Sequence, residues 1–149
     1  MLIADLTNSG AIPTLELSMR FAGQRQQLLA HNIANVSTPD FRPLDVSPDR
    51  FAQLLRDAVD DRRARTGGER GELHLRSSRE IAVSQSPGGT RLTLNPRTPS
   101  GNILFHDRNN RDLERLMQAN AENVAAYRVS AELLKSRYDI LKAAIAERA

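Results

Sequence analysis

The chain has 149 residues, of which 40% are hydrophobic, 26% are charged and 4% are aromatic, and it contains no tryptophan and no cysteine. This length suits one modest domain or one small domain with appendages. The absence of cysteine excludes disulfides and thiolate metal sites. Because aromatic side chains bring much of the area that a compact core buries, their scarcity predicts a slim core or one completed by partners.

The formal net charge is +3, and the positive charge is concentrated in the middle of the sequence. Residues 1–61 carry 5 basic and 8 acidic residues, residues 62–111 carry 10 basic and 4 acidic, and residues 112–149 carry 6 of each. The first residues lack a basic region and their apolar run is broken at Asp5, so we expect no cleaved signal peptide. No stretch approaches the roughly 20 apolar residues of a membrane span, so we expect no direct membrane insertion.

The first long pattern predicts a helix from about Pro13 to Asn35, with proline near its start. The helix is expected to end before Pro39, because proline disfavours a helical conformation in the residue before it. Steps of four and three residues place a narrow seam on one face, interrupted by one polar residue: Leu15, Met19, Ala22, Gln26, Leu29 and Ile33.

The middle of the chain predicts short elements and a linker. Ser47 and Pro48 are suited to start a second helix that runs to about Arg63. Two adjacent glycines and many arginines predict a flexible basic linker over residues 62–71. Alternating residues predict a small β region, with a hairpin turn at residues 87–89 and strands at residues 72–76, 80–84 and 90–94.

The last pattern is the strongest, and it predicts one long helix that Asn109, Asn110 or Asp112 can cap. A helix of about 36 residues is roughly 54 Å long, so it needs another long helix beside it. Asn120 is expected to weaken the seam while fixing its register. Both seam positions of five heptads are filled by Leu113, Asn120, Tyr127, Leu134 and Leu141, and by Met117, Val124, Ala131, Tyr138 and Ile145.

These elements predict a mainly α fold in which long N- and C-terminal helices form a helical hairpin or coiled-coil layer, with a small irregular β-containing middle segment. We expect three regions: an N-terminal axial helix and turn over residues 1–46, a short helix, basic linker and β region over residues 47–100, and a long C-terminal axial helix over residues 101–149.

Nothing in the sequence predicts a catalytic, metal or cofactor site. His31, His74 and His106 lack partners at metal-ligand spacing. The acidic residues near Asp60 lie beside arginines, which indicates a helix end with ion pairs, and the glycine pairs match no phosphate-binding loop. Arginine dominates the basic residues, with 19 Arg and 2 Lys, but no aromatic lies between Phe51 and Phe105 to stack on bases. We therefore expect no nucleic-acid binding.

The end of the first helix carries a distinctive segment, Asn32-Ile33-Ala34-Asn35 followed by Thr38-Pro39. It resembles flagellar rod, hook and hook-associated axial proteins, whose N-terminal helix ends in Asn-Ile-Ala-Asn and then Thr-Pro-Gly-Tyr. The chain departs from that motif at Asp40 and Phe41. Residues 24–29 and 110–145 are similar to the proximal, FlgB-type branch of the rod proteins, and the small size suits a rod protein.

The resemblance implies a structural subunit of the bacterial flagellar basal-body rod, located in the periplasm and exported through the flagellar type III apparatus without signal cleavage. Its partners would be copies of itself, other rod proteins, and components of the base-of-rod junction, membrane ring and export gate. Assembly would transmit torque and bury narrow seams that are marginal on isolated helices.

The expected assembly interface consists of seam residues on both terminal helices: Leu15, Met19, Leu29, Ile33, Leu113, Met117, Val124, Tyr127, Leu134, Tyr138, Leu141 and Ile145. One alternative is a non-flagellar coiled-coil adaptor that binds a single partner helix with the same seams. A less favoured alternative is an arginine-rich nucleic-acid-binding protein, whose binding would fall steeply with salt.

Overall fold

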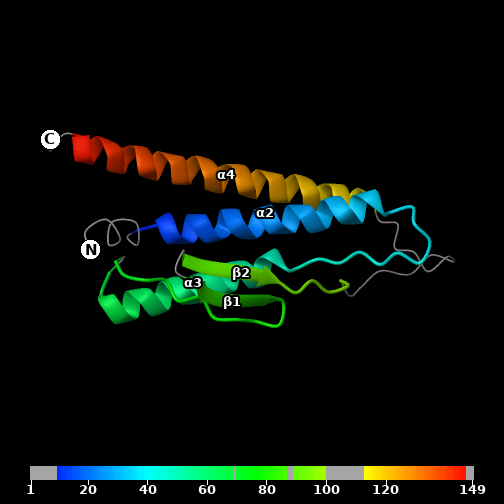
Figure 1. Ribbon diagram of the computed structural model, residues 1–149, viewed down its shortest axis with the longest axis horizontal. Coiled ribbons are helices and arrows are strands. Elements are labelled where there is room, and N and C mark those ends of the chain that lie inside the picture. The colour runs from blue at the N-terminus through cyan, green and yellow to red at the C-terminus, as the bar shows by residue number, and fades with distance from the viewer. Residues whose placement is uncertain (1–9, 69, 87–88, 100–112, 147–149) are drawn as a thin grey trace.

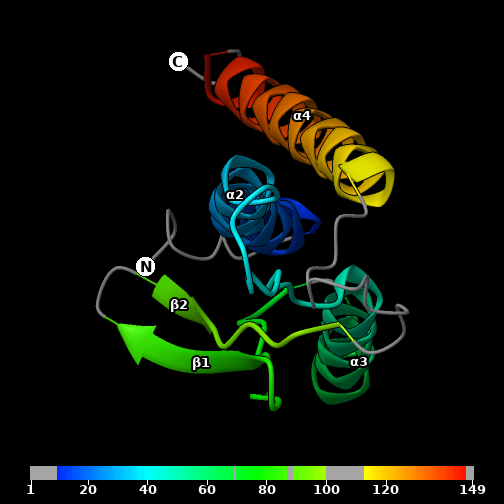
Figure 2. The ribbon, with the colours of Figure 1, turned by 90° about the vertical axis from the view of Figure 1, so that its right-hand side faces the viewer.

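The computed structural model of the chain describes residues 10–68, 70–86, 89–99 and 113–146. Its elements form three layers: α4 lies on one side, α2 in the middle, and α3 with a two-stranded sheet on the other side (Figures 1 and 2). This arrangement confirms the predicted mainly α fold. In chain order the elements are α2 (Ile12–Ala34), α3 (Pro48–Thr66), β1 (Ile81–Ser86), β2 (Gly89–Leu94) and α4 (Leu113–Ala146).

The two long helices form the predicted antiparallel hairpin. Gln26, near the end of α2, contacts Asn120, near the start of α4, whereas Glu16 contacts Tyr138, near the end of α4. The helices have 23 and 34 residues, so α4 continues beyond the N-terminal end of α2 (Figure 1). The last turns of α4 therefore have no part of α2 beside them.

The central helix α2 buries a second face, which the narrow seam did not predict. Leu17 and Phe21 lie on this face and join the main hydrophobic core, which also contains residues of α3, β1 and β2. The Phe21 ring stacks on the Phe51 ring of α3 with centroids 4.1 Å apart and an interplanar angle of 3°. Leu17, Phe21 and Leu28 recur at steps of four and seven, so α2 has two apolar stripes.

Helix α3 begins as predicted but continues further along the chain. Ser47 caps it by accepting a hydrogen bond from the Arg50 backbone N–H at 3.3 Å. The expected flexible linker is wrong for its first part, because the helix reaches Thr66 and Gly67 ends it with a φ of 67°. Arg62 is only 2% exposed and donates to the Gly10 carbonyl at 3.0 Å, so this arginine packs rather than extending into solvent.

The predicted hairpin forms between β1 and β2, with Ile81 opposite Leu94 and Ser86 opposite Gly89. Arg20 and Gln24 of α2 donate hydrogen bonds to the carbonyls of Thr90 and Leu92, at 2.7 and 3.0 Å. These bonds attach strand β2 to the central helix.

The strand expected at residues 72–76 is wrong, since this segment joins no ladder. Its alternation has a different cause: Leu73 and Leu75 point into the core, while His74 and Arg76 are exposed. Several other expectations fall outside the described residues: the turn at residues 87–88, the helix caps at Asn109, Asn110 and Asp112, and His106.

Candidate assembly surface and helix-exit segment

The line of α4 that faces α2 differs from the predicted heptad seam. Its buried residues are Asn123, Ser130 and Leu134, of which only Leu134 belongs to the seam. Asn123 donates hydrogen bonds to the Ala22 carbonyl at 2.9 Å and to the Gln26 side chain at 2.8 Å. The α2 contact is therefore rotated to one side of the seam, and it is partly polar.

The two polar seam residues contact each other. Gln26 donates from Nε2 to Oδ1 of Asn120 at 2.6 Å, and Asn123 completes the cluster. Because these amides satisfy one another only when the two helices are aligned, the cluster favours one register of the hairpin. The pairing agrees with the register role expected for Asn120.

A second polar link joins the helices near the N-terminal end of α2. The Tyr138 hydroxyl donates a hydrogen bond to the Glu16 carboxylate at 2.8 Å. This bond, with desolvation of the ring adding to it, raises the pKa of Tyr138 above its usual value. Because the pKa of Tyr138 is raised, its hydrogen bond stabilises the folded state fully below the ordinary tyrosine pKa. This stabilisation is lost as the pH rises through the pKa of Tyr138 in the folded state.

The residues predicted for the assembly interface fall into three groups by exposure. Leu29 and Leu134 are buried within the chain. Six are half-buried: Leu15, Met19, Ile33, Val124, Tyr138 and Leu141. Exposed on α4 are Leu113, Met117, Tyr127 and Ile145.

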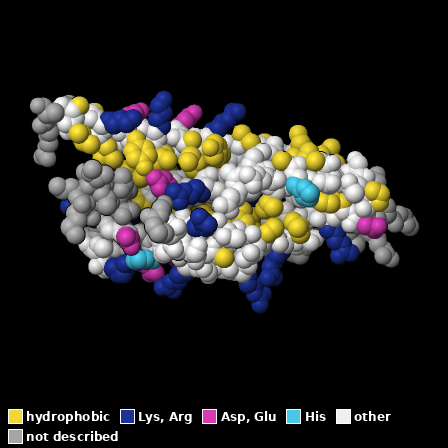
Figure 3. Space-filling view, viewed as in Figure 1, with side chains coloured by type: hydrophobic (Ala, Val, Ile, Leu, Met, Phe, Trp, Pro, Cys, Tyr) yellow, Lys and Arg dark blue, Asp and Glu magenta, His cyan; other side chains and the backbone are white. Residues whose placement is uncertain are grey.

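Most of the exposed apolar surface lies on α4. Of the eight large hydrophobic residues exposed in the described part of the chain, seven belong to this helix, and they are 42–63% exposed. Hydrophobic side chains gather along the edge of α4 that adjoins α2, while basic side chains lie on its outer side (Figure 3). Sequence reasoning missed three of the seven, Val129, Leu133 and Ile140, although they are spaced by four and seven residues.

The segment that carries the resemblance to axial proteins, from Asn32 to Pro39, forms the exit from α2. Asn35 ends the helix, and its side chain donates to the His31 carbonyl at 2.9 Å. Asn32 is 1% exposed and makes two bonds to Leu44: its amide donates to the Leu44 carbonyl at 2.8 Å and accepts from the Leu44 N–H at 3.1 Å. The two asparagines thus contact backbone groups, and Asn32 holds the departing chain against the helix.

The turn after Asn35 places Asp40, where the axial-protein motif has glycine, in a conformation that favours glycine. The Phe41 N–H donates to the Thr38 carbonyl at 3.2 Å, which closes a four-residue turn around Pro39 and Asp40. Asp40 has a φ of 58°, a left-handed conformation that favours glycine at this position of a turn. The ring of Phe41 then lies edge-on against His31, with centroids 5.7 Å apart.

We expect the variant Asp40→Gly to raise the free energy of unfolding by about 0.5 kcal/mol, because glycine adopts this φ without the steric cost that an L-residue has. The variant Asp40→Val is expected to lower it by about 1–2 kcal/mol, since branching at Cβ makes the left-handed region costly. Urea denaturation followed by circular dichroism measures both. The opposite order of the two variants would contradict the assigned turn.

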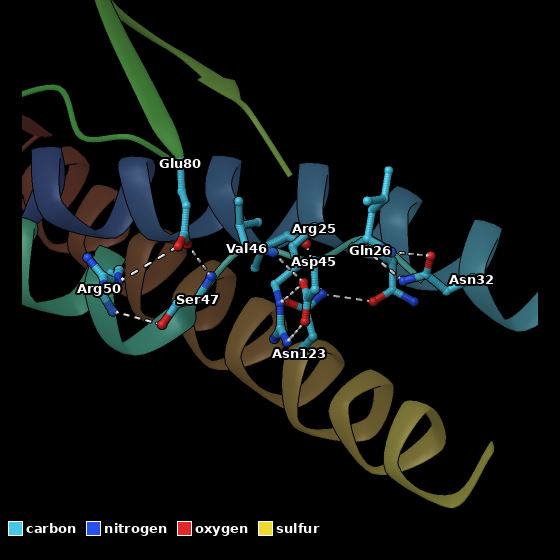
Figure 4. Close-up of polar contacts among 11 residues, drawn as sticks. Arg25, Gln26, Asn32, Asp45, Val46, Ser47, Arg50, Glu80 and Asn123 are labelled. Carbon is cyan, nitrogen blue, oxygen red and sulfur yellow. Dashed lines mark hydrogen bonds and ion pairs between the residues drawn. The ribbon is translucent and has the colours of Figure 1, made fainter. Parts of the chain in front are cut away.

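A buried ion pair holds the same segment to α2 (Figure 4). Arg25, which is 6% exposed, donates from Nε and Nη2 to the two carboxylate oxygens of Asp45 at 2.8 and 2.6 Å. Asp45 also accepts from the Val46 N–H and pairs through its backbone with Arg97. Glu80 accepts from the Ser47 N–H at 2.9 Å, so the exit segment is fixed to both α2 and the sheet region.

These polar groups surround an open hollow of about 630 Å³ between α2, the exit segment and the first turns of α4. In the described residues, no three histidine, aspartate or glutamate side chains are grouped to hold a metal ion. The predicted ion pairing at the end of α3 is present between Asp60 and Arg63 at 3.7 Å, and Asp61 also pairs with Arg76, beyond the helix, at 3.0 Å. None of the described helices is long and apolar enough to cross a membrane.

Two known proteins are similar to this chain over most of its length. A flagellar basal body rod protein FlgB from Yersinia enterocolitica is 34% identical over 103 residues, covering 66% of this chain and 72% of the relative. A flagellar basal body rod protein FlgB from Salmonella typhimurium is 32% identical over 120 residues, covering 80% of this chain and 81% of the relative. No protein-family model matches the chain.

Proposed function

The chain belongs to the FlgB family of flagellar basal body rod proteins, and from this premise we propose that it assembles with copies of itself and other rod proteins through α2 and α4. In this proposal residues 1–46 and 101–149 form the axial part of the subunit, and residues 47–100 form a lateral segment. The observation that carries it is the set of exposed apolar side chains on α4, which the hairpin with α2 leaves uncovered.

The physical reason for assembly is the cost of leaving these side chains in water. Burying apolar surface contributes about 25 cal/mol per Å², so a helix with seven large exposed hydrophobic side chains gains when neighbouring subunits cover them. A subunit that offers different surfaces to different neighbours builds an open helical array, which is the form of a rod.

The proposed role is structural and not catalytic, with neither cofactor nor nucleic acid as a partner. Torque would pass through the packed helices. We place the subunit in the periplasmic part of the basal body, near the base-of-rod junction and the membrane-ring and export-gate components, after export without a cleaved signal. The family membership supports this placement, and the exposed apolar side chains of α4 support assembly with neighbouring subunits.

The test is to image basal bodies purified from cells that lack this gene and to measure swimming of the same cells. We expect the membrane ring to persist without a rod, and export of later axial proteins to stop. Restoring the gene in trans is the control for effects on neighbouring genes. Complete basal bodies in swimming cells would refute the rod role and favour the partner-helix adaptor instead.

A further inference from the structure

The exposed hydrophobic residues of α4 form two separate faces. At about 100° per residue, one group lies on one side of the line that faces α2, and we name it the seam flank: Leu113, Met117, Tyr127 and Ile145. Val129, Leu133 and Ile140 lie on the other side, and we name them the outer flank. The two flanks are about 170° apart around the helix axis, so one neighbouring helix cannot cover both.

The charges beside the flanks are complementary. Arg128, Lys135 and Lys142 recur every seven residues and form a basic line about 50° from the seam flank, on the side away from α2. Glu132 and Asp139 form an acidic line between the basic line and the outer flank. All five side chains are exposed, and the one ion pair among them is Lys142 to Asp139 at 3.9 Å within the same helix.

We propose that the seam flank of one copy packs against the outer flank of a second copy of this chain, with the two α4 helices side by side and parallel. In this arrangement the basic line of the first copy lies next to the acidic line of the second. Long lysine side chains span the gap between neighbouring helices, as at the edges of coiled coils. The proposal rests on the assembly role proposed above and specifies its geometry.

The alternative of a two-fold dimer is less favourable. A two-fold contact places the same flank of both copies together and leaves the other flank of each in water. If the seam flanks met across a two-fold axis perpendicular to the helices, the basic lines of the two copies would also lie on the same side of the contact, close to one another. The heterologous contact covers both flanks and repeats from copy to copy, which is the type of contact that an open helical array uses.

Charge reversal tests the contact in cells that lack the native gene. One variant carries Lys135→Glu with Lys142→Glu, and the other carries Glu132→Lys with Asp139→Lys. Each variant alone places like charges together at the contact, so we expect roughly tenfold less incorporation into purified basal bodies. When both variants are expressed together, opposite charges meet at every contact and incorporation should recover.

The control carries Arg56→Glu with Arg79→Glu, two exposed residues of the middle segment, which changes the net charge by the same amount as the lysine variant. It should assemble like the unmodified chain. Circular dichroism verifies that each variant folds. Co-expression that improves nothing over either variant alone overturns the contact.

Crosslinking gives a second readout, because the chain contains no cysteine and introduced thiols are unique. Ala131→Cys lies beside the seam flank and Leu133→Cys on the outer flank, about 3 Å apart along the axis. A short bis-maleimide should join two copies in basal bodies only when both variants are present. A dimer from Leu133→Cys alone indicates a two-fold contact and overturns the proposal.

The outcomes separate this contact from the rod role. If deletion removes the rod but the mixed variants neither recover nor crosslink, the rod role stands and the contact is wrong. If the mixed variants crosslink in concentrated purified protein while deletion leaves swimming intact, the contact stands and the rod role is wrong.

Discussion

Replacing Asp45 by alanine is expected to lower the free energy of unfolding by about 3–5 kcal/mol, because it leaves the Arg25 guanidinium buried without its carboxylate. Only 7% of the Arg25 side chain and 22% of the Asp45 side chain are exposed, so water replaces little of the lost interaction. The Val46 N–H loses its acceptor as well. Chemical denaturation of the purified variant, followed by circular dichroism, measures the loss.

Two further variants show whether burial causes the effect. Asp61→Ala breaks the ion pair with Arg76 and is expected to lower the free energy of unfolding by less than about 1 kcal/mol, because the Arg76 side chain is 79% exposed and the Asp61 side chain is 47% exposed. Arg25→Met combined with Asp45→Leu removes both charges and should recover much of the stability lost in Asp45→Ala. Equal losses for Asp45→Ala and Asp61→Ala would show that the buried pair stabilises the chain no more than a surface pair.

The heptad pattern predicted the helical hairpin but not which side of each helix faces the other. Periodicity shows that a helix has an apolar stripe, yet it gives no direction for the neighbour that covers it. On α4 the buried contact line runs through Asn123 and Ser130, two polar residues that a hydrophobic pattern passes over. Asn123 is buried because it bonds to Ala22 and Gln26, a tertiary circumstance that the sequence does not reveal.

The middle segment shows a related limit. Arginine-rich sequence followed by glycines predicted a linker from Arg62, whereas the helix continues for four more residues and buries that arginine. Arginine favours helix intrinsically, and its long stem packs well against a core, so composition alone misjudges where such a helix ends. The glycines correctly predicted a break in the helix, because Gly67 provides its left-handed C-terminal cap.

The exit from α2 was the part of the candidate site that could be predicted in most detail. Asparagine side chains that bond to backbone groups, a proline and a residue with positive φ are local features, and local sequence encodes them. Arg25 and Asp45 are 20 residues apart, and no spacing rule pairs them. The sequence therefore predicted the turn itself but not the ion pair that fixes it to the helix.

Replacing Asn32 by alanine is expected to lower the free energy of unfolding by about 2–3 kcal/mol and to release the exit segment from α2. The side chain is fully enclosed and makes two bonds to Leu44, so its loss removes a donor and an acceptor together and leaves a small cavity. Denaturation measures the stability, and hydrogen exchange at the Leu44 amide measures the release. We expect that amide to exchange much faster in the variant.

The matched control is Asn35→Ala, three residues further along the same helix end. The Asn35 side chain donates to the His31 carbonyl at 2.9 Å and has longer contacts with the His31 ring and the Thr38 hydroxyl. All of these lie near solvent and water replaces them, so the expected loss is about 0.5–1 kcal/mol. Because Asn35 does not touch Leu44, exchange at that amide should stay unchanged. If the two alanine variants behave alike in both measurements, the segment acts only as a helix end, and Asn32 has no separate role in holding the departing chain.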